Sequence, residues 1–306
     1  MKADCHTHSI FSSDGELSIE KMTAIALEKG LSYLAVTDHV DFDALLEKNR
    51  APSYWKQPDT ELYAATVQRL KPAAADKGLY LAFGAEMGFD ADPAAQRPAK
   101  ELIESTPFDV IINSVHFAGG LDLYFPEYFK GRTKKQAYEL YLDTVYESLF
   151  AEFSFDIVGH LGYVTRQAPY PDKEIRLSES GEKIDRILKR IIASDKTLEV
   201  NTNRGLNPNA EILARYFELG GRNVSFGSDA HHGGLCDGWD EAVKVLRCQR
   251  CFPSFPYLSA ESAKACRFKR LPKKSVFPVL SGNFYFVGSF LFKKLTRAVF
   301  NAIINR

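Results

Sequence analysis

The chain has 306 residues, of which 45% are hydrophobic and 25% charged, and its formal net charge is zero. This is the composition of a soluble globular enzyme with a sizeable core. Residues 262–306 contain ten of the 39 basic residues and no acidic one, so residues 1–261 carry a net charge of −10. Such an acidic body argues against a nucleic-acid-binding protein, because phosphate backbones require clustered positive charge.

The N-terminal sequence and the cysteines indicate the compartment. The first residues, MKADCHTHS, read directly as a strand and lack the apolar run of a secretory signal. The five cysteines are odd in number and form no regular disulfide framework. We therefore expect a cytoplasmic protein. Cys248 and Cys251 form an isolated Cys-x-x-Cys pair, which favours incidental thiols over a zinc or redox site.

Short apolar runs alternate with amphipathic stretches along the chain. The expected strands cover residues 2–6, 32–38, 79–86, 109–116, 155–160, 197–201 and 223–229. The expected helices cover residues 18–29, 59–76, 96–105, 134–152, 179–194, 207–219 and 238–247. Ser18 and Asp59 are typical of helix starts, and Gly30 and Gly220 of helix ends.

This alternation implies parallel strands joined by crossover helices. Seven strand–helix units favour a closed or nearly closed barrel over two separate domains. No linker rich in Gly, Ser or Pro occurs before residue 250. We therefore predict an α/β fold, a distorted (β/α)7 barrel of the TIM type, over residues 1–247. Residues 248–306 would form a C-terminal extension.

The histidines lie at or just past the C-terminal ends of the expected strands. They are His6, His8, His39, His116, His160, His231 and His232. In a barrel this end carries the active site, because the strand-to-helix loops converge there. Any one of these histidines alone would be more typical of the core or the surface. Their occurrence at five separate strand ends favours a metal site.

Two further patterns support this interpretation, whereas Asp14 alone does not. The i, i+2 spacing of His6 and His8 points both rings to one face of a strand, and Asp229 and His231 repeat it. Glu86 closes the apolar run YLAFGAE, where a buried carboxylate needs a partner such as a bridging metal ion. Asp14, by itself, reads as a turn aspartate.

The candidate ligands are imidazoles and carboxylates, which suit Zn, Mn or Fe(II). They are His6, His8, Asp14, His39, Glu86, His116, His160, Asp229 and His231. Nine ligands exceed the needs of one ion, so two or three divalent ions are expected.

The motifs H-T-H, T-D-H, a strand-end Glu, S-V-H, G-H and G-S-D-A-H, in this order, resemble the polymerase and histidinol phosphatase (PHP) superfamily. Residues 108–149, 155–170 and 198–231 look like its histidinol-phosphatase branch, and the resemblance covers roughly residues 2–247. One departure is Gly162, which stands where this branch commonly has Asp.

The resemblance implies a cluster of three ions. The first would be held by His6, His8, Glu86 and Asp229. Glu86 would bridge to a second ion, which is shared with His116 and His160. Asp14, His39 and His231 would hold the third ion, whereas His232 matches no ligand of the family.

The implied reaction is hydrolysis of L-histidinol phosphate to L-histidinol and phosphate, a step of histidine biosynthesis, by metal-activated hydroxide. Glu86, Asp229 and His231 would be catalytic. Arg166 and Arg204 follow the fifth and sixth strands and are either a phosphate clamp or surface arginines.

Two alternatives stay open at this point. One is another phosphoesterase of the superfamily, acting on nucleotides or short oligonucleotides. The other is an inactive metal-binding module. The acidic body favours a small-molecule phosphate ester over nucleic acid, and the complete ligand set favours an enzyme.

The C-terminal region is the least enzyme-like part of the sequence. Residues 275–292 carry no charge and have basic flanks, which is the lower limit for a membrane span. Proline, glycine and polar residues dilute this run. A packed extension is favoured over a weak membrane contact or a change of reading frame near residue 247. Under each of these interpretations the catalytic residues lie elsewhere.

Overall fold

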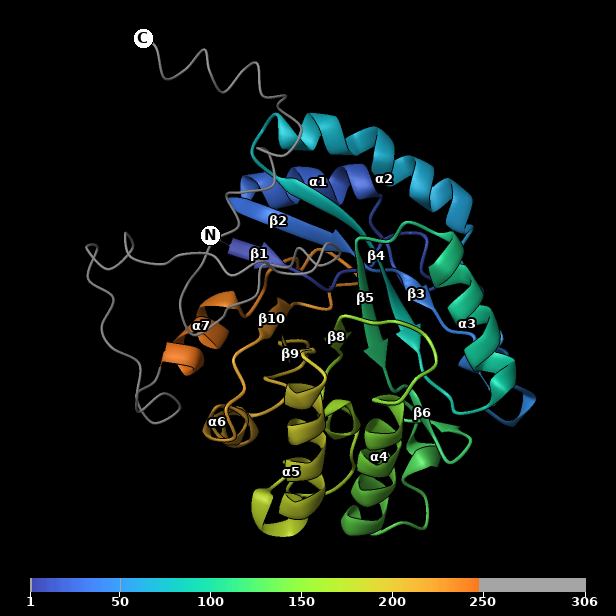
Figure 1. Cartoon of the computed structure of the whole chain (residues 1–306), viewed down its shortest axis with the longest axis vertical. Helices are drawn as coiled ribbons and strands as arrows, with labels where there is room; N and C mark the ends of the chain where they lie inside the picture. The colour runs from blue at the N-terminus through green and yellow to red at the C-terminus, as the bar shows by residue number, and fades with distance from the viewer. Residues whose placement is uncertain (1, 50, 248–306) are drawn as a thin grey trace.

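The computed structural model describes residues 2–49 and 51–247 and confirms the predicted α/β barrel (Figure 1). Seven parallel strands follow one another around the sheet in the order β1–β2–β4–β5–β8–β9–β10. Their bounds are Lys2–Asp4, Leu31–Val36, Tyr80–Gly88, Val110–Ser114, Ile157–Val158, Thr197–Asn201 and Val224–Gly227.

Within the described residues, seven α-helices lie on the outside of this sheet (Figure 1). They are α1 (Ile19–Glu28), α2 (Thr60–Ala75), α3 (Pro93–Ser105), α4 (Lys134–Ser148), α5 (Leu177–Ala193), α6 (Ala210–Glu218) and α7 (Trp239–Arg247). The two predicted helix starts are confirmed, because Ser18 accepts a hydrogen bond from the backbone N–H of Lys21, and Asp59 one from Leu62. Short 3-10 turns at Asp43–Leu45, Glu47–Asn49, Pro126–Tyr128 and Tyr163–Thr165 interrupt the connecting loops.

The barrel is closed by the segment that follows β1. The Cys5 N–H donates to the carbonyl of Phe226 at 2.8 Å, and the Asp229 N–H donates to the carbonyl of His6 at 2.8 Å. The buried Asp4 carboxylate strengthens this seam, because it accepts hydrogen bonds from the backbone and hydroxyl of Ser228 at 3.0 and 2.6 Å. The first and last strands, more than 220 residues apart in sequence, therefore lie side by side.

The strands are buried on both faces, as expected of a parallel barrel. Leu34, Val36 and Ile111 belong to the large core cluster. The alternate residues of the same strands, including Tyr33 and Ile112, belong to a second, smaller cluster. This arrangement explains why the strands read as continuous apolar runs in the sequence.

Several element boundaries differ from those expected. Helix α3 begins at Pro93 rather than residue 96, because Asp92 caps it through the Ala94 N–H and proline suits the first helical position. Helix α6 begins at Ala210 rather than residue 207, because Asn209 is its cap. Strand β10 ends at Gly227, and Asp229 has a φ of 53°, outside the extended region.

Three short strands were not predicted. Strand β3 (His39–Val40) is a separate piece that pairs with β4, and it places His39 in register with Glu86. Strands β6 (Phe117–Ala118) and β7 (Leu121–Asp122) form an antiparallel hairpin directly after β5. These additions build up the C-terminal rim of the barrel.

The helices of the described residues include none that is long and apolar enough to cross a membrane. The Cys248–Cys251 pair, the uncharged run at 275–292 and the whole proposed extension lie outside the described residues.

Candidate metal centre

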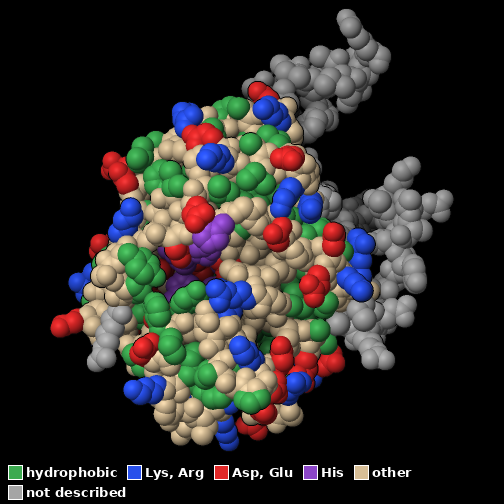
Figure 2. Space-filling model, turned by 180° about the vertical axis from the view of Figure 1, so that it is seen from behind, with side chains coloured by type: hydrophobic (Ala, Val, Ile, Leu, Met, Phe, Trp, Pro, Cys, Tyr) green, Lys and Arg blue, Asp and Glu red, His purple; other side chains and the backbone are tan. Residues whose placement is uncertain are grey.

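The C-terminal ends of the strands surround a cleft of about 590 Å³, and the nine predicted ligands gather there. Figure 2 shows histidine side chains at the bottom of a hollow in this face, next to acidic ones. Seven of the nine line the cleft itself: Asp14, His39, Glu86, His116, His160, Asp229 and His231. The other two, His6 and His8, are completely buried beneath them.

Glu86 lies at the centre of the cluster. Its Oε1 is 2.8 Å from Nε2 of His160 and 3.1 Å from Nε2 of His116. Its Oε2 is 3.1 Å from Nε2 of His6, 3.4 Å from Nε2 of His8 and 3.1 Å from Nδ1 of His39. The two oxygens of one carboxylate thus face two different groups of imidazoles, which is the arrangement that a bridging ligand requires.

Oε2 of Glu86 and the three imidazole nitrogens that lie 3.1–3.4 Å from it are buried, and these four atoms make no hydrogen bond among the described residues. They are Nε2 of His6, Nε2 of His8, Nδ1 of His39 and Oε2 of Glu86. Each buried and unpaired polar atom costs about 1–3 kcal/mol, so four around one point are not tolerated without a reason. Imidazole nitrogens and a carboxylate oxygen are a donor set that suits a divalent ion. The residues therefore fit a metal site.

The pKa shifts of Glu86 and His231 agree with a site that binds a divalent ion. Burial raises the pKa of Glu86, but His6, His116 and His39 outweigh it and hold that pKa well below the usual range. Burial likewise opposes the charged form of His231, yet its hydrogen bond to Asp14 and the charge of Asp229 raise its pKa to about 9. Metal ligands must be deprotonated, so metal binding at His231 would release a proton.

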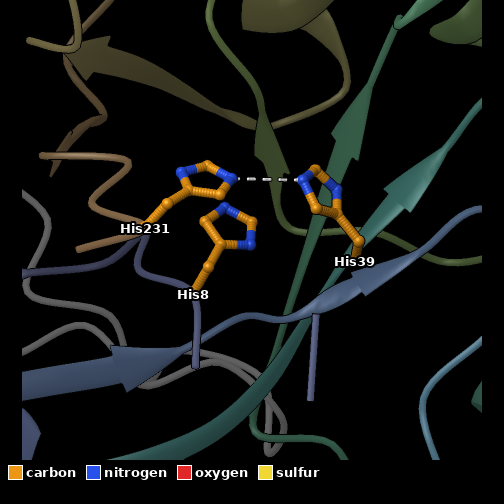
Figure 3. Close-up of side chains that lie close together, drawn as sticks. All are labelled: His8, His39 and His231. Atoms are coloured by element: carbon orange, nitrogen blue, oxygen red, sulfur yellow. Dashed lines mark hydrogen bonds between the residues drawn. The ribbon is translucent and has the colours of Figure 1, made fainter. Parts of the chain in front are cut away.

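A second group of imidazoles joins the buried His8 to His39 and His231, which are partly exposed in the cleft. His8, His39 and His231 come from three segments that are far apart in the chain and converge there (Figure 3). The two Nε2 atoms of His39 and His231 are 3.4 Å apart, and the rings of His8 and His231 stack with centroids 4.0 Å apart. Asp14 Oδ2 is 3.3 Å from Nε2 of His231 and 3.8 Å from Nε2 of His39. The structure thus brings Asp14, His39 and His231 together.

Asp41 is a candidate ligand that the sequence analysis missed. Its Oδ2 lies 3.4 Å from Nδ1 of His39 and 3.6 Å from Nδ1 of His116, and the three residues form a group that could hold an ion. The signal was present in the sequence. Asp41 follows His39 by two residues, the same spacing that identified His6 with His8 and Asp229 with His231.

Glu199 is the second residue that was missed. It is buried on β9, and its carboxylate is 2.7 Å from Nδ1 of His6 and accepts the backbone N–H of His160 at 2.5 Å. A carboxylate behind an imidazole fixes the ring's tautomer and orientation for metal binding. Glu199 in the apolar run LEVN could have been found by the argument used for Glu86.

The two predicted arginines line the cleft but are held differently. Arg166 is buried, with a side chain only 6% exposed, and donates to Oδ2 of Asp229 at 2.8 Å. It is therefore not a surface arginine, and it leaves Oδ1 of Asp229 directed at His8, 3.2 Å away. Arg204 is exposed and hydrogen-bonds the hydroxyl of Tyr124 at 3.2 Å.

The structure shows the surroundings of Gly162 and His232, two residues that the sequence set apart from the candidate ligands. Gly162 has a φ of 137°, and a Cβ atom there would lie 2.6 Å from Oδ1 of Asn207, so an aspartate does not fit without a shift of Asn207. His232 is mostly exposed, and its Nδ1 is 3.2 Å from Oε1 of Glu16. His232 is thus outside the buried cluster, as expected of a loop residue.

Fold and site together define the class: a TIM-type α/β barrel with a candidate metal centre of imidazoles and carboxylates at the strand ends. When the chain is compared with known protein families, residues 4–203 match the PHP domain. The chain belongs to the PHP domain family, and the resemblance seen in the sequence is confirmed.

The relatives agree with this assignment. The chain is 31% identical over 240 residues to the histidinol-phosphatase of Lactococcus lactis subsp. lactis, a match that covers 75% of this chain and 84% of the relative. It is 29% identical over 238 residues to a probable histidinol-phosphatase of Clostridium acetobutylicum, covering 76% and 87%.

The fold has a solved counterpart. A crystal structure of histidinol phosphate phosphatase from Lactococcus lactis subsp. lactis, complexed with Zn, L-histidinol and phosphate, superposes with a TM-score of 0.71 at 29% identity. This match covers 80% of the chain and 91% of that structure.

Proposed function

We propose that the protein is a metal-dependent phosphatase that hydrolyses L-histidinol phosphate to L-histidinol and phosphate. One observation carries the proposal. Glu86 directs each of its oxygens at a separate group of buried imidazoles, and several of their nitrogens have no partner among the described residues. This centre lies in a barrel similar to that of an enzyme crystallised with Zn, L-histidinol and phosphate.

The proposed centre holds two or three divalent ions, with Zn, Mn and Fe as candidates. His6, His8, Glu86 and Asp229 would hold the first, and Glu86, His116 and His160 the second. Asp14, His39 and His231 would hold the third. Bound ions of this kind lower the pKa of water and neutralise phosphoryl oxygens.

The chain's own residues supply the remaining functions. Glu86 holds the two halves of the centre at a fixed separation. Oδ2 of Asp229 accepts a hydrogen bond from Arg166, so Oδ1, which lies 3.2 Å from Nε2 of His8, is the oxygen that would face the first ion and the water activated there. Arg204 at the mouth of the cleft presents a guanidinium suited to a phosphate. His231, beside Asp229 and Asp14, completes the proposed catalytic group.

The remaining parts of the proposal concern the whole chain. We assign the activity to a barrel domain of residues 1–247, with residues 248–306 as an extension and the cytoplasm as the location. A small-molecule phosphate ester, rather than nucleic acid, is the proposed partner.

The test compares release of inorganic phosphate from L-histidinol phosphate with cleavage of a dinucleotide to its mononucleotide products by the purified protein, together with elemental analysis. We expect efficient hydrolysis of histidinol phosphate and two to three equivalents of transition metal per chain. Cleavage of the dinucleotide alone would instead favour a nuclease of the same family. One equivalent of metal or none in active protein would contradict the cluster.

A further inference from the structure

One carboxylate of the cleft differs from all the others in its surroundings. The acidic residues that line the cleft are Asp14, Asp41, Glu86, Asp122, Asp229 and Asp237. Five of these six carboxylates lie within 4.0 Å of a basic or imidazole side chain. The pairs are Asp14 with His231, Asp41 with His39, Glu86 with His6, Asp229 with Arg166, and Asp237 with Lys29. Within residues 2–49 and 51–247, Asp122 has no such partner.

The backbone holds Asp122 close to the metal centre. Asp122 lies on β7 and pairs in register with Phe117, the residue after the candidate ligand His116. The next residue, Leu123, donates its N–H to the carbonyl of His116 at 2.9 Å. The Asp122 carboxylate itself accepts the N–H of Tyr124 at 2.8 Å. It is therefore a positioned group and not a freely moving surface side chain.

The hydrogen bond from the Tyr124 N–H does not require a charge, because a neutral side-chain oxygen would accept it as well. An aspartate in the same cleft as Glu86, Asp41 and Asp229 adds negative charge where a phosphate must enter. Such a carboxylate is unfavourable for the phosphate and useful only if another part of the substrate is cationic. L-Histidinol phosphate has such a part, because its ammonium group is attached to the second carbon from the ester oxygen.

We propose that Asp122 binds the ammonium group of the substrate and thereby selects amino-alcohol phosphates over esters with a neutral leaving group. This inference rests on the proposed function. A phosphate at the metal centre places the neighbouring ammonium a few bonds away, beside the hairpin that follows His116. A charged hydrogen bond there aligns the ester and rejects substrates that leave Asp122 unpaired.

The experiment compares Asp122→Asn with the wild type on two substrates, L-histidinol phosphate and p-nitrophenyl phosphate. A charged hydrogen bond contributes about 1.5–3 kcal/mol, so kcat/KM for histidinol phosphate should fall about ten- to a hundredfold. The value for p-nitrophenyl phosphate, which has no ammonium group, should not fall. Asp237→Asn is the matched control: it removes a carboxylate from the same cleft that Lys29 already pairs at 2.9 Å, and should change neither value.

A second measurement uses the wild-type protein and the analogue of histidinol phosphate that lacks the amine. The analogue should be a poorer substrate by the same factor, and Asp122→Asn should not worsen it further. Equal loss on both esters, no loss on either, or full activity with the analogue would overturn the proposal. If the wild type hydrolyses p-nitrophenyl phosphate but not histidinol phosphate, it is the proposed function that fails.

Discussion

Glu86 connects the two halves of the candidate centre, so its replacement tests the bridging role. Glu86→Gln should lower activity more than His8→Ala does, on the order of a hundredfold or more, because the neutral amide no longer attracts two ions. The measurement is kcat/KM at saturating metal, with metal content determined in parallel. A loss equal to or smaller than that of His8→Ala would remove Glu86 from the bridging position.

The two arginines make a matched pair, because both line the cleft but only Arg166 is bonded to a candidate ligand. Arg204→Ala should lower kcat/KM about ten- to a hundredfold, as expected for loss of a charged hydrogen bond to phosphate, without loss of metal. Arg166→Ala should lower both kcat/KM and metal affinity, because it also releases Asp229. Activity assays with metal titration distinguish the two, and wild-type values for both variants would contradict a role in the cleft.

At the scale of elements, the strand ends explain why the ligands converge. Parallel strands place their C-terminal ends on one rim. The pairs His6–His8 and Asp229–His231 lie in the segments that directly follow β1 and β10 at this rim. The short additions matter as much as the main strands. Strand β3 sets His39 beside Glu86, and the β6–β7 hairpin fixes Asp122 next to His116.

The turn after β8 gives a prediction about stability. Gly162 has a φ of 137° and no room for a Cβ, whereas Gly78 has a φ of 81° and open space around it. Gly162→Ala should lower the free energy of unfolding more than the control does, because backbone strain of about 1–3 kcal/mol is increased by the clash with Asn207. Gly78→Ala, the control, should cost about 1–2 kcal/mol from the backbone alone. Denaturant unfolding compares them, and equal losses would show that the contact with Asn207 relaxes freely.

At the scale of the whole molecule, the barrel closes within the described residues. The contacts from Cys5 to Phe226 and from Asp4 to Ser228 join its two ends, and every candidate ligand lies before residue 232. We therefore expect truncation after Lys274 to leave metal content and kcat/KM unchanged. We expect any effect of the truncation to be on solubility or stability. A folded truncate that binds its metals but has lost all activity would show that the C-terminal region contributes to the site.

The barrel, its seven strands and the location of the candidate ligands could all be predicted from the sequence. The periodicity that indicates a strand or a helix can be read from neighbouring residues. A parallel barrel then brings all the C-terminal strand ends together, whatever the details of packing. Glu86 could be found because a carboxylate at the end of an apolar run has no other explanation.

Only the tertiary structure decided which ligands share an ion-sized space and which residues support them. Asp41 contacts His116, and Glu199 contacts His6, tens to hundreds of positions away in the chain, and local patterns do not specify such partners. Arg166 is the clearest case. From the sequence, Arg166 could be a phosphate clamp or a surface residue. In the structure its guanidinium is buried against Asp229, since a buried guanidinium needs a carboxylate partner.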